Sequence, residues 1–204
     1  SVEASGTRLH EDGTHTVTLT GLLANVNTAL NGLVYVTDAN YNGTDFIQIV
    51  TSDLGNWPTP TLTDTDSVTL TIEPVNDAPV NQYGGSNLVG IPARSVDEDT
   101  DLVFSGSTQV GVFDLDAAEG TGEVNVTLAV TNGIVTLGSL AGLTSQSGDG
   151  SALVTLQGPL ANVNAALDNL RFRGNQDFNG QARIVMTTSD LGNKGWSLPV
   201  GGVF

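Results

Sequence analysis

An internal repeat with a period of 137 residues constrains this chain more than any other feature. Residues 12–56 align with residues 149–193 without a gap, and 23 of these 45 aligned positions are identical. Identity over such a length predicts two copies of one structural unit. The start of the sequence does not coincide with the start of a repeat, because residue 1 aligns with residue 138, inside the second copy. The first copy therefore has no counterpart of residues 76–137, and we expect it to be an incomplete repeat.

The two copies meet at residues 73–80, which read Glu-Pro-Val-Asn-Asp-Ala-Pro-Val. The prolines stiffen this segment because the ring fixes one backbone angle of each. We expect a short linker here that separates residues 1–75, the latter half of a repeat, from residues 76–204, a second repeat. The second repeat lacks a match for the strand-like residues 67–72 of the first, so it lacks its last strand.

The composition excludes several classes of function. The chain has 22 acidic and 6 basic residues and a formal net charge of −16, so it lacks the Lys and Arg that phosphate contacts require. Such a surplus of carboxylates destabilises a compact state unless cations compensate it. The absence of cysteine excludes disulfides, zinc thiolates and a thiol nucleophile. No apolar run approaches the roughly 20 residues of a membrane span.

Short alternating segments predict strands through most of the chain. Apolar and polar residues alternate over residues 124–130, which predicts a strand with one buried face. The Asn132-Gly133 pair that follows is a strong hairpin signal, so we expect residues 134–137 to return antiparallel.

Two further patterns repeat in both copies. Apolar residues at helical spacing predict one short helix over residues 160–167 and another over residues 23–30. Residues 170–173 alternate apolar residues with Arg, which predicts a strand, and the first copy should turn Leu33 and Tyr35 inward in the same way. Many short strands with turn signals between them predict an all-β chain of tandem Greek-key β-sandwich repeats, of cadherin or immunoglobulin type.

Four motifs resemble the calcium motifs of cadherin-like repeats. They are Ser-Val-Asp-Glu-Asp-Thr at 95–100, Phe-Asp-Leu-Asp at 113–116, Thr-Ser-Asp-Leu-Gly at 188–192 and Val-Asn-Asp-Ala-Pro at 75–79. Together with the long period, they resemble the cadherin-like tandem repeats of giant bacterial surface proteins. The resemblance covers essentially the whole chain.

The resemblance implies a Ca²⁺ site at the linker. Calcium takes six to eight oxygen ligands, mostly carboxylates and carbonyls. The linker would supply Asn76 and Asp77, and the second domain would supply Asp114, Asp116 and Asp190. On an extended segment the Asp-x-Asp spacing would point the first two of these three carboxylates the same way.

The resemblance implies three further ligands. Asn40 and Asn42 occupy the positions of the family's basal carboxylates, and Glu98 should face the other end of the second domain with Asp177 and Asn179. Because the two first-copy residues are neutral, we expect fewer or weaker ions at this junction than in the family. The Asn-Gly pairs of both copies also fit ordinary turns, and the acidic run around Glu98 also fits a solvated surface.

These features favour a calcium-binding, rod-forming segment of a large extracellular adhesion or matrix protein, such as a bacterial adhesin. Ca²⁺ would rigidify the junction between neighbouring repeats. We expect no enzyme activity, because His10 and His15 are the only histidines and neither belongs to a catalytic motif.

The alternative is a secreted β-sandwich module that binds a surface glycan or a protein, with Trp57 and Trp196 as the candidate contact residues. A separate question concerns the incomplete first copy, which would expose strand edges. Either the sequence is cut from a longer repeat array, or another chain completes the sheet by strand addition. We expect no nucleic-acid partner and no membrane insertion.

Overall fold

The computed structural model describes residues 3–7, 16–55, 60–87, 92–118 and 120–192. Contacts divide the chain into one unit of residues 1–39 and a second unit of residues 40–204. Each unit is described by itself. This division lies before the boundary at residues 75 and 76 that the repeat predicts, and that boundary remains a prediction.

The first unit contains two strands and one helix. β1 (Glu3–Thr7) pairs antiparallel with β2 (Thr16–Thr20), and α1 (Leu23–Leu30) follows. The helix forms where the spacing of apolar residues predicts it, yet none of its residues is buried. Leu23 is 74% exposed, so α1 lacks the packing that normally stabilises so short a helix.

The second unit begins with a long β-hairpin. β3 (Gly43–Ser52) and β4 (Thr63–Ile72) have ten residues each and pair antiparallel along their full length. Threonine, valine and isoleucine recur in both strands, which is typical of extended backbone because their branched side chains favour it.

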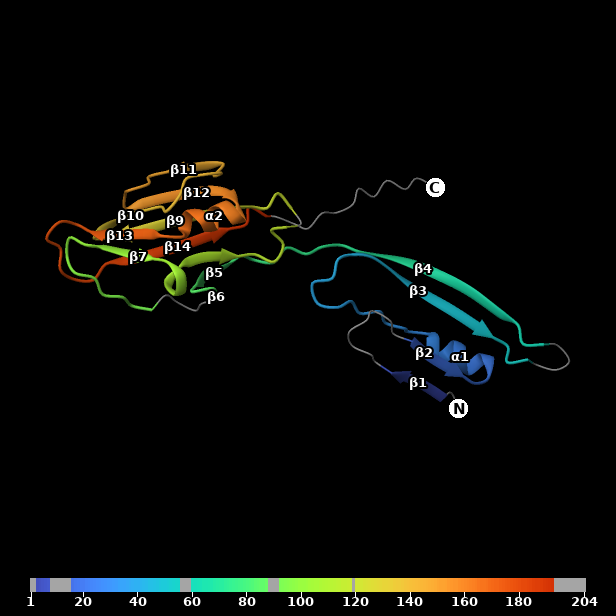
Figure 1. The fold of residues 1–204 in the computed structure, drawn as a ribbon. Coiled ribbons are helices and arrows are strands. Elements are labelled where there is room, and N and C mark those ends of the chain that lie inside the picture. The colour runs from blue at the N-terminus through green and yellow to red at the C-terminus, as the bar shows by residue number, and fades with distance from the viewer. Residues whose placement is uncertain (1–2, 8–15, 56–59, 88–91, 119, 193–204) are drawn as a thin grey trace. The chain divides into compact units, whose positions relative to one another are not determined.

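The remaining strands form three small sheets (Figure 1). Their orders are β6-β5-β8, β10-β13-β7 and β11-β12-β9-β14, with antiparallel pairing throughout. The elements are β5 (Val80–Tyr83), β6 (Ser86–Asn87), β7 (Asp101–Phe104), η1 (Gly106–Thr108), β8 (Val110–Phe113), β9 (Glu123–Thr131), β10 (Gly133–Thr136), β11 (Ser145–Ser147), β12 (Leu153–Pro159), α2 (Leu160–Leu167), β13 (Leu170–Gly174) and β14 (Arg183–Ser189).

These sheets and α2 enclose one hydrophobic core. The alternating residues of β9 are buried as predicted, with Val124 and Val126 fully inaccessible, and Leu170 and Phe172 of β13 face the same core. From α2, Val163 and its neighbours on the same helix face join them. Full burial of one such side chain contributes roughly 1.5–3 kcal/mol, so this core accounts for most of the stability of the fold.

The hairpin predicted at Asn132-Gly133 is wrong. β9 pairs with β12 and β14, whereas β10 pairs with β13 in another sheet, so the chain crosses between sheets at this point. Asn132 has a φ of 59°, which produces the sharp change of direction. Gly133 is needed for close approach, because a Cβ there would lie 2.5 Å from the carbonyl oxygen of Arg173.

The inward orientation predicted for Leu33 and Tyr35 is also wrong. These residues are 59% and 38% exposed, and residues 33–38 form no strand. Their counterparts in β13 are extended and buried because β10 and β7 pair with β13 on its two sides. Among the described residues, residues 33–38 pair with no strand, so the same pattern alone does not produce a strand.

The prediction of an all-β chain is confirmed, with two short helices that the repeat also predicts. Among the described residues, no helix has the length and apolar character needed to cross a membrane.

Candidate functional site

The candidate site begins in the turn that follows β8. Asp114 and Asp116 are both only 6% exposed, which is unusual for carboxylates. The backbone N–H of Asp116 donates to Oδ1 of Asp114 at 3.0 Å. The backbone bends here, so the expectation of an extended Asp-x-Asp segment is wrong. A side-chain to backbone turn, and not strand periodicity, brings the two acidic residues together.

Asp190 enters the site from the end of β14. The backbone N–H of Gly192 donates to its Oδ1 at 2.9 Å, and Leu191 takes a φ of 59°. The first copy has the same turn, since Gly55 donates to Asp53 at 2.9 Å and Leu54 has a φ of 54°. The shared Ser-Asp-Leu-Gly sequence therefore forms the same turn in both copies. The carboxylates of Asp190 and Asp53 stabilise this turn by accepting a backbone N–H, independently of any bound ion.

The linker is hydrogen-bonded to these turns. Nδ2 of Asn76 donates to Oδ2 of Asp190 at 2.6 Å. The backbone N–H of Asp77 donates to Oδ2 of Asp116. The structure thus brings together all five of the linker and second-domain residues that the sequence singles out, namely Asn76, Asp77, Asp114, Asp116 and Asp190.

Two oxygens at this site have no partner among the described residues. Oδ1 of Asn76 and Oδ2 of Asp114 are both buried without a hydrogen bond. A buried polar atom left unpaired costs about 1–3 kcal/mol, and more when it carries charge. Such an atom therefore calls for an explanation, and a bound cation is one explanation, because it would coordinate oxygen acceptors of this kind.

The environment shifts the two pKa values that bear on this site in opposite directions. Burial raises the pKa of Asp114, and the negative charges of Asp190 and Asp116 raise it further, although the N–H of Asp116 opposes this shift. Hydrogen bonds from the backbone of Gly192 and the side chain of Asn76 lower the pKa of Asp190. Asp114 is consequently the carboxylate that a nearby cation would stabilise most.

One residue that positions β8 was not predicted from the sequence. Asn164 of α2 accepts from the backbone N–H of Val112 at 2.8 Å and donates to its carbonyl oxygen at 2.9 Å. This pair of bonds fixes the strand two residues before Asp114. The available signal was the identity of Asn164 with Asn27 in the first copy.

Asn81 in β5 holds the chain just after the linker against β14. Its Nδ2 donates to the carbonyl oxygen of Met186 at 3.1 Å, and the hydroxyl of Thr188 donates to its Oδ1 at 2.6 Å. These bonds keep the chain that follows the linker next to the strand that ends at Asp190. No pattern in the sequence distinguishes Asn81 from the other asparagines.

The side chains are not arranged as a closed metal site. Within the described ranges, no group of three or more His, Cys, Asp or Glu is placed so that it could hold an ion. The amide oxygen of Asn76 and backbone carbonyls are ligands outside that set, and calcium uses both kinds. Binding would therefore require the carboxylates of the site to move toward one another.

Glu98 and Asn179 lie elsewhere in the second unit. Both line a hollow of about 340 Å³ with Phe172 and Phe178 among its walls. This hollow adjoins the loop before β14, whereas Asp190 follows the end of that strand. The acidic residues predicted for the far end of the domain are thus separated from the linker by the length of β14.

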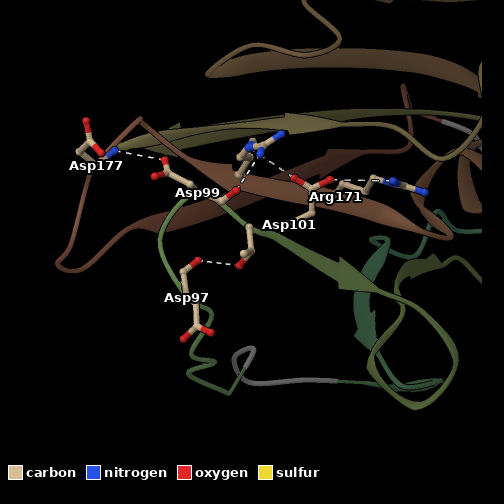
Figure 2. A network of polar contacts seen from close by, with 7 residues as sticks. Asp97, Asp99, Asp101, Arg171 and Asp177 are labelled. Atoms are coloured by element: carbon tan, nitrogen blue, oxygen red, sulfur yellow. Dashed lines mark hydrogen bonds and ion pairs between the residues drawn. The ribbon is translucent and has the colours of Figure 1, made fainter.

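A polar network stabilises the loops beside this hollow (Figure 2). The backbone N–H of Asp177 donates to Oδ1 of Asp99 at 3.2 Å, and Arg173 donates to the carbonyl oxygen of Asp99 at 2.7 Å. Arg171 and Arg173 also lie 3.9 and 3.7 Å from Asp101. These ion pairs are exposed, so each contributes about 0–1 kcal/mol.

Asn40 and Asn42 lie in the turn that leads into β3. Asn40 has a φ of 60°, and its counterpart Asp177 has a φ of 55°, so the two copies share this turn as well. Asn42 is half-buried and precedes Gly43, whose φ is 122°. Of the other candidates, His10, His15, Trp57 and Trp196 lie outside the described residues.

No protein-family model, curated protein or solved structure matches this chain. The cadherin-like resemblance therefore rests on the motifs and on their spacing.

Proposed function

We propose that this chain is a calcium-binding, rod-forming segment of a large extracellular adhesion or matrix protein. In this proposal residues 1–75 and 76–204 belong to two Greek-key β-sandwich repeats of cadherin-like type. Ca²⁺ binds beside Asp77 and rigidifies the junction between them.

One observation carries the proposal. A linker amide and a linker backbone N–H are hydrogen-bonded to carboxylates that are at most 9% exposed, and two buried oxygens there have no partner. A purely structural turn needs neither three buried acidic residues nor unpaired acceptors. A cation would offset the repulsion among them.

The donor set favours calcium over other metals. The side chains at the site offer only carboxylate and amide oxygens, whereas zinc and copper prefer nitrogen or sulfur ligands. Calcium tolerates irregular geometry and adjustable ligand numbers, whereas magnesium requires near-ideal octahedral geometry. A site whose carboxylates must close around the ion suits the more tolerant metal.

The proposed effect on the junction is electrostatic. Without a cation, the negative charges of Asp116 and Asp190 repel that of Asp114. Among the described residues, two side-chain hydrogen bonds tie the linker to the turns that carry these carboxylates. With a cation, oxygens of the linker and of the second repeat share one positive charge, which restricts the linker. The same ion would satisfy Oδ1 of Asn76 and Oδ2 of Asp114.

Calorimetric titration of the whole chain with CaCl₂ tests the proposal. We expect binding with a dissociation constant of about 10⁻⁴ to 10⁻³ M, the range of extracellular calcium modules. The variant Asp114→Asn/Asp116→Asn should lose this binding, because it removes both buried carboxylates of the β8 turn.

The matched control is Asp64→Asn/Asp66→Asn, which removes two exposed charges from β4. This control should bind calcium as the unmodified chain does. Equal calcium binding by all three proteins would contradict the proposal, because it would mean that the acidic surface binds ions without a site.

A further inference from the structure

The sheet β11-β12-β9-β14 has one side packed on the core and a second side, called here the outer face, that points away from it. In β9, β12 and β14 the even-numbered residues face the core, so the odd-numbered residues form the outer face. Strand pairing aligns these residues in rows that cross the sheet. The rows are Ser147-Thr155-Thr127-Thr187, Ser145-Gln157-Asn125-Ser189 and Leu153-Ala129-Val185.

Two charged residues flank these uncharged rows, at opposite ends of the outer face. Glu123 is the first residue of β9, and Arg183 is the first residue of β14, which runs antiparallel to β9. Side-chain hydrogen bonds from Thr144 and Gln157 hold the carboxylate of Glu123. Among the described residues, no carboxylate lies within ion-pair distance of Arg183.

This distribution of charge differs from that of the whole chain. The chain has 22 acidic and 6 basic residues and a net charge of −16, so two copies of it repel one another overall. The outer face carries one positive and one negative charge and has no net charge. Because these charges lie at opposite ends, the outer face is complementary to a copy of itself that is turned end for end.

A continuation of the chain would not cover this surface if it follows the first copy. There, β4 pairs with the edge of β3, and β3 is the counterpart of β14 in the repeat. A strand added in the same way beside β14 would widen the sheet within its own plane, so the outer face would stay open.

We propose that the outer face binds the outer face of a second copy of this chain, with the strands of the two copies antiparallel. Thr127 lies at the centre of the contact, four residues from Glu123 along β9 and four from Thr131, which pairs with Arg183. A twofold axis beside Thr127, directed across the strands, therefore brings Glu123 of each copy to the end of the outer face where the other copy has Arg183. An axis directed along the strands would instead place Glu123 opposite its own copy, and like charges disfavour that arrangement.

Hydroxyl groups meet at the centre of this contact. The row through Thr127 lies on the axis, so it faces its own copy, and each hydroxyl can both donate and accept a hydrogen bond. Four strands at about 4.8 Å spacing and seven residues at about 3.3 Å rise give a face of roughly 400 Å². Stable interfaces bury about 800 Å² per partner, so this contact should be weak and reversible. Several such repeats in one chain would strengthen it by multivalency.

Sedimentation equilibrium of the whole chain tests the proposal. At chain concentrations up to about 1 mM we expect a reversible dimer with a dissociation constant on the order of 10⁻⁴ M. Thr127→Asp should weaken the dimer at least about tenfold, because it places two carboxylates against each other at the axis. The matched control is Thr136→Asp in β10, which adds the same charge at another half-buried threonine and should dimerise as the unmodified chain does.

A charge exchange tests the antiparallel arrangement. Glu123→Arg and Arg183→Glu should each dimerise about tenfold more weakly alone, because each gives both ends of the outer face the same charge. An equimolar mixture of the two variants should regain the affinity of the unmodified chain, because each positive end then meets a negative one. All samples contain EDTA, so a failure here leaves the calcium proposal standing, and a failure of that proposal leaves this one standing.

Three results would overturn the inference. A chain that remains monomeric at the highest concentration would show that the outer face serves a different partner, such as a neutral glycan. A dimer that Thr127→Asp leaves intact would place the contact elsewhere. A mixture of the charge variants that associates no better than either variant alone would rule out the antiparallel arrangement.

Discussion

At the scale of single residues, the three buried carboxylates near the linker have different roles. Asp190 is stabilised as an anion by the N–H of Gly192 and the amide of Asn76. Asp53 repeats the turn of Asp190 without a linker amide, since its Oδ1 accepts from Gly55 and Leu62. Asp114 destabilises the folded state when it is ionised, because burial and neighbouring charges disfavour its charged form. Of the three carboxylates, a bound cation would therefore stabilise the charged form of Asp114 most.

Asp114→Asn should therefore have two opposite effects. In EDTA the variant should melt at a higher temperature than the unmodified chain, since it removes a buried charge that destabilises the fold. On addition of millimolar calcium, the melting temperature of the variant should rise less than that of the unmodified chain. Differential scanning calorimetry in both buffers measures both effects, with Asp66→Asn as a single-charge control on the exposed surface. A variant that loses stability in EDTA would contradict the role assigned to Asp114.

The two shifted pKa values also predict opposite pH dependences in EDTA. The pKa of Asp114 is raised above its ordinary value of 3.8, so the destabilisation it causes is full at neutral pH and is relieved as the pH falls through its folded pKa. The pKa of Asp190 is lowered from 3.8, so its stabilising contribution persists above that value and is lost only as the pH falls through its lower folded pKa.

Unfolding by urea between pH 7 and pH 3 measures this difference. The increase in the free energy of unfolding caused by Asp114→Asn should be greatest at pH 7 and should become smaller as the pH falls. The decrease in the free energy of unfolding caused by Asp190→Asn should stay constant down to about pH 4 and then become smaller. Parallel pH profiles for the two variants would contradict the account.

At the scale of elements, the site depends on how α2 and β14 hold the strands that lead into it. Asn164 bonds both backbone groups of Val112, and Asn81 bonds β5 to β14. These contacts position the β8 turn and the start of the second repeat. Asn27, the counterpart of Asn164 in α1, is exposed.

Asn164→Ala should destabilise the second unit by about 1–3 kcal/mol, since it leaves the buried N–H and C=O of Val112 unpaired. The matched control is Asn27→Ala, which changes the exposed counterpart in α1 and should alter stability by less than about 0.5 kcal/mol. Urea unfolding monitored by circular dichroism compares the two. Similar losses in both variants would show that the bonds to Val112 are not the cause.

The crossing between sheets at Asn132-Gly133 can be tested with a second pair of variants, one at each of two paired glycines. Gly133→Ala should cost about 1–3 kcal/mol, because the new Cβ would meet the backbone of Arg173 and the ring of Phe172 at 2.5 Å. Gly174 pairs with Gly133, yet a Cβ there would meet nothing closer than 4.0 Å, so Gly174→Ala should be nearly neutral. Equal melting temperatures of these variants would contradict the close approach at residue 133.

At the scale of the whole molecule, apolar spacing and the repeat predicted different parts of the fold. Apolar spacing predicted both helices, and the repeat placed them at equivalent positions of the two copies. The turn at Ser-Asp-Leu-Gly was not predicted, although its identical residues give both copies the same backbone geometry. The motifs also singled out five residues that hydrogen bonds link at the end of the second unit, and their role as ligands stays a prediction. Neither apolar spacing nor the repeat predicted the crossing at Asn132-Gly133 or the fate of residues 33–38, because both depend on partner strands that local sequence does not specify.

The central claim is that calcium binds at the linker and stabilises the junction, and a thermal melt with and without calcium tests it most directly. At a calcium concentration tenfold above the dissociation constant, one site should raise the melting temperature of the second unit by about 3 to 6 °C relative to EDTA. Magnesium at the same ionic strength should give a smaller rise, and Asp114→Asn/Asp116→Asn should give almost none. If the unmodified chain melts at the same temperature in calcium and in EDTA, the claim is wrong.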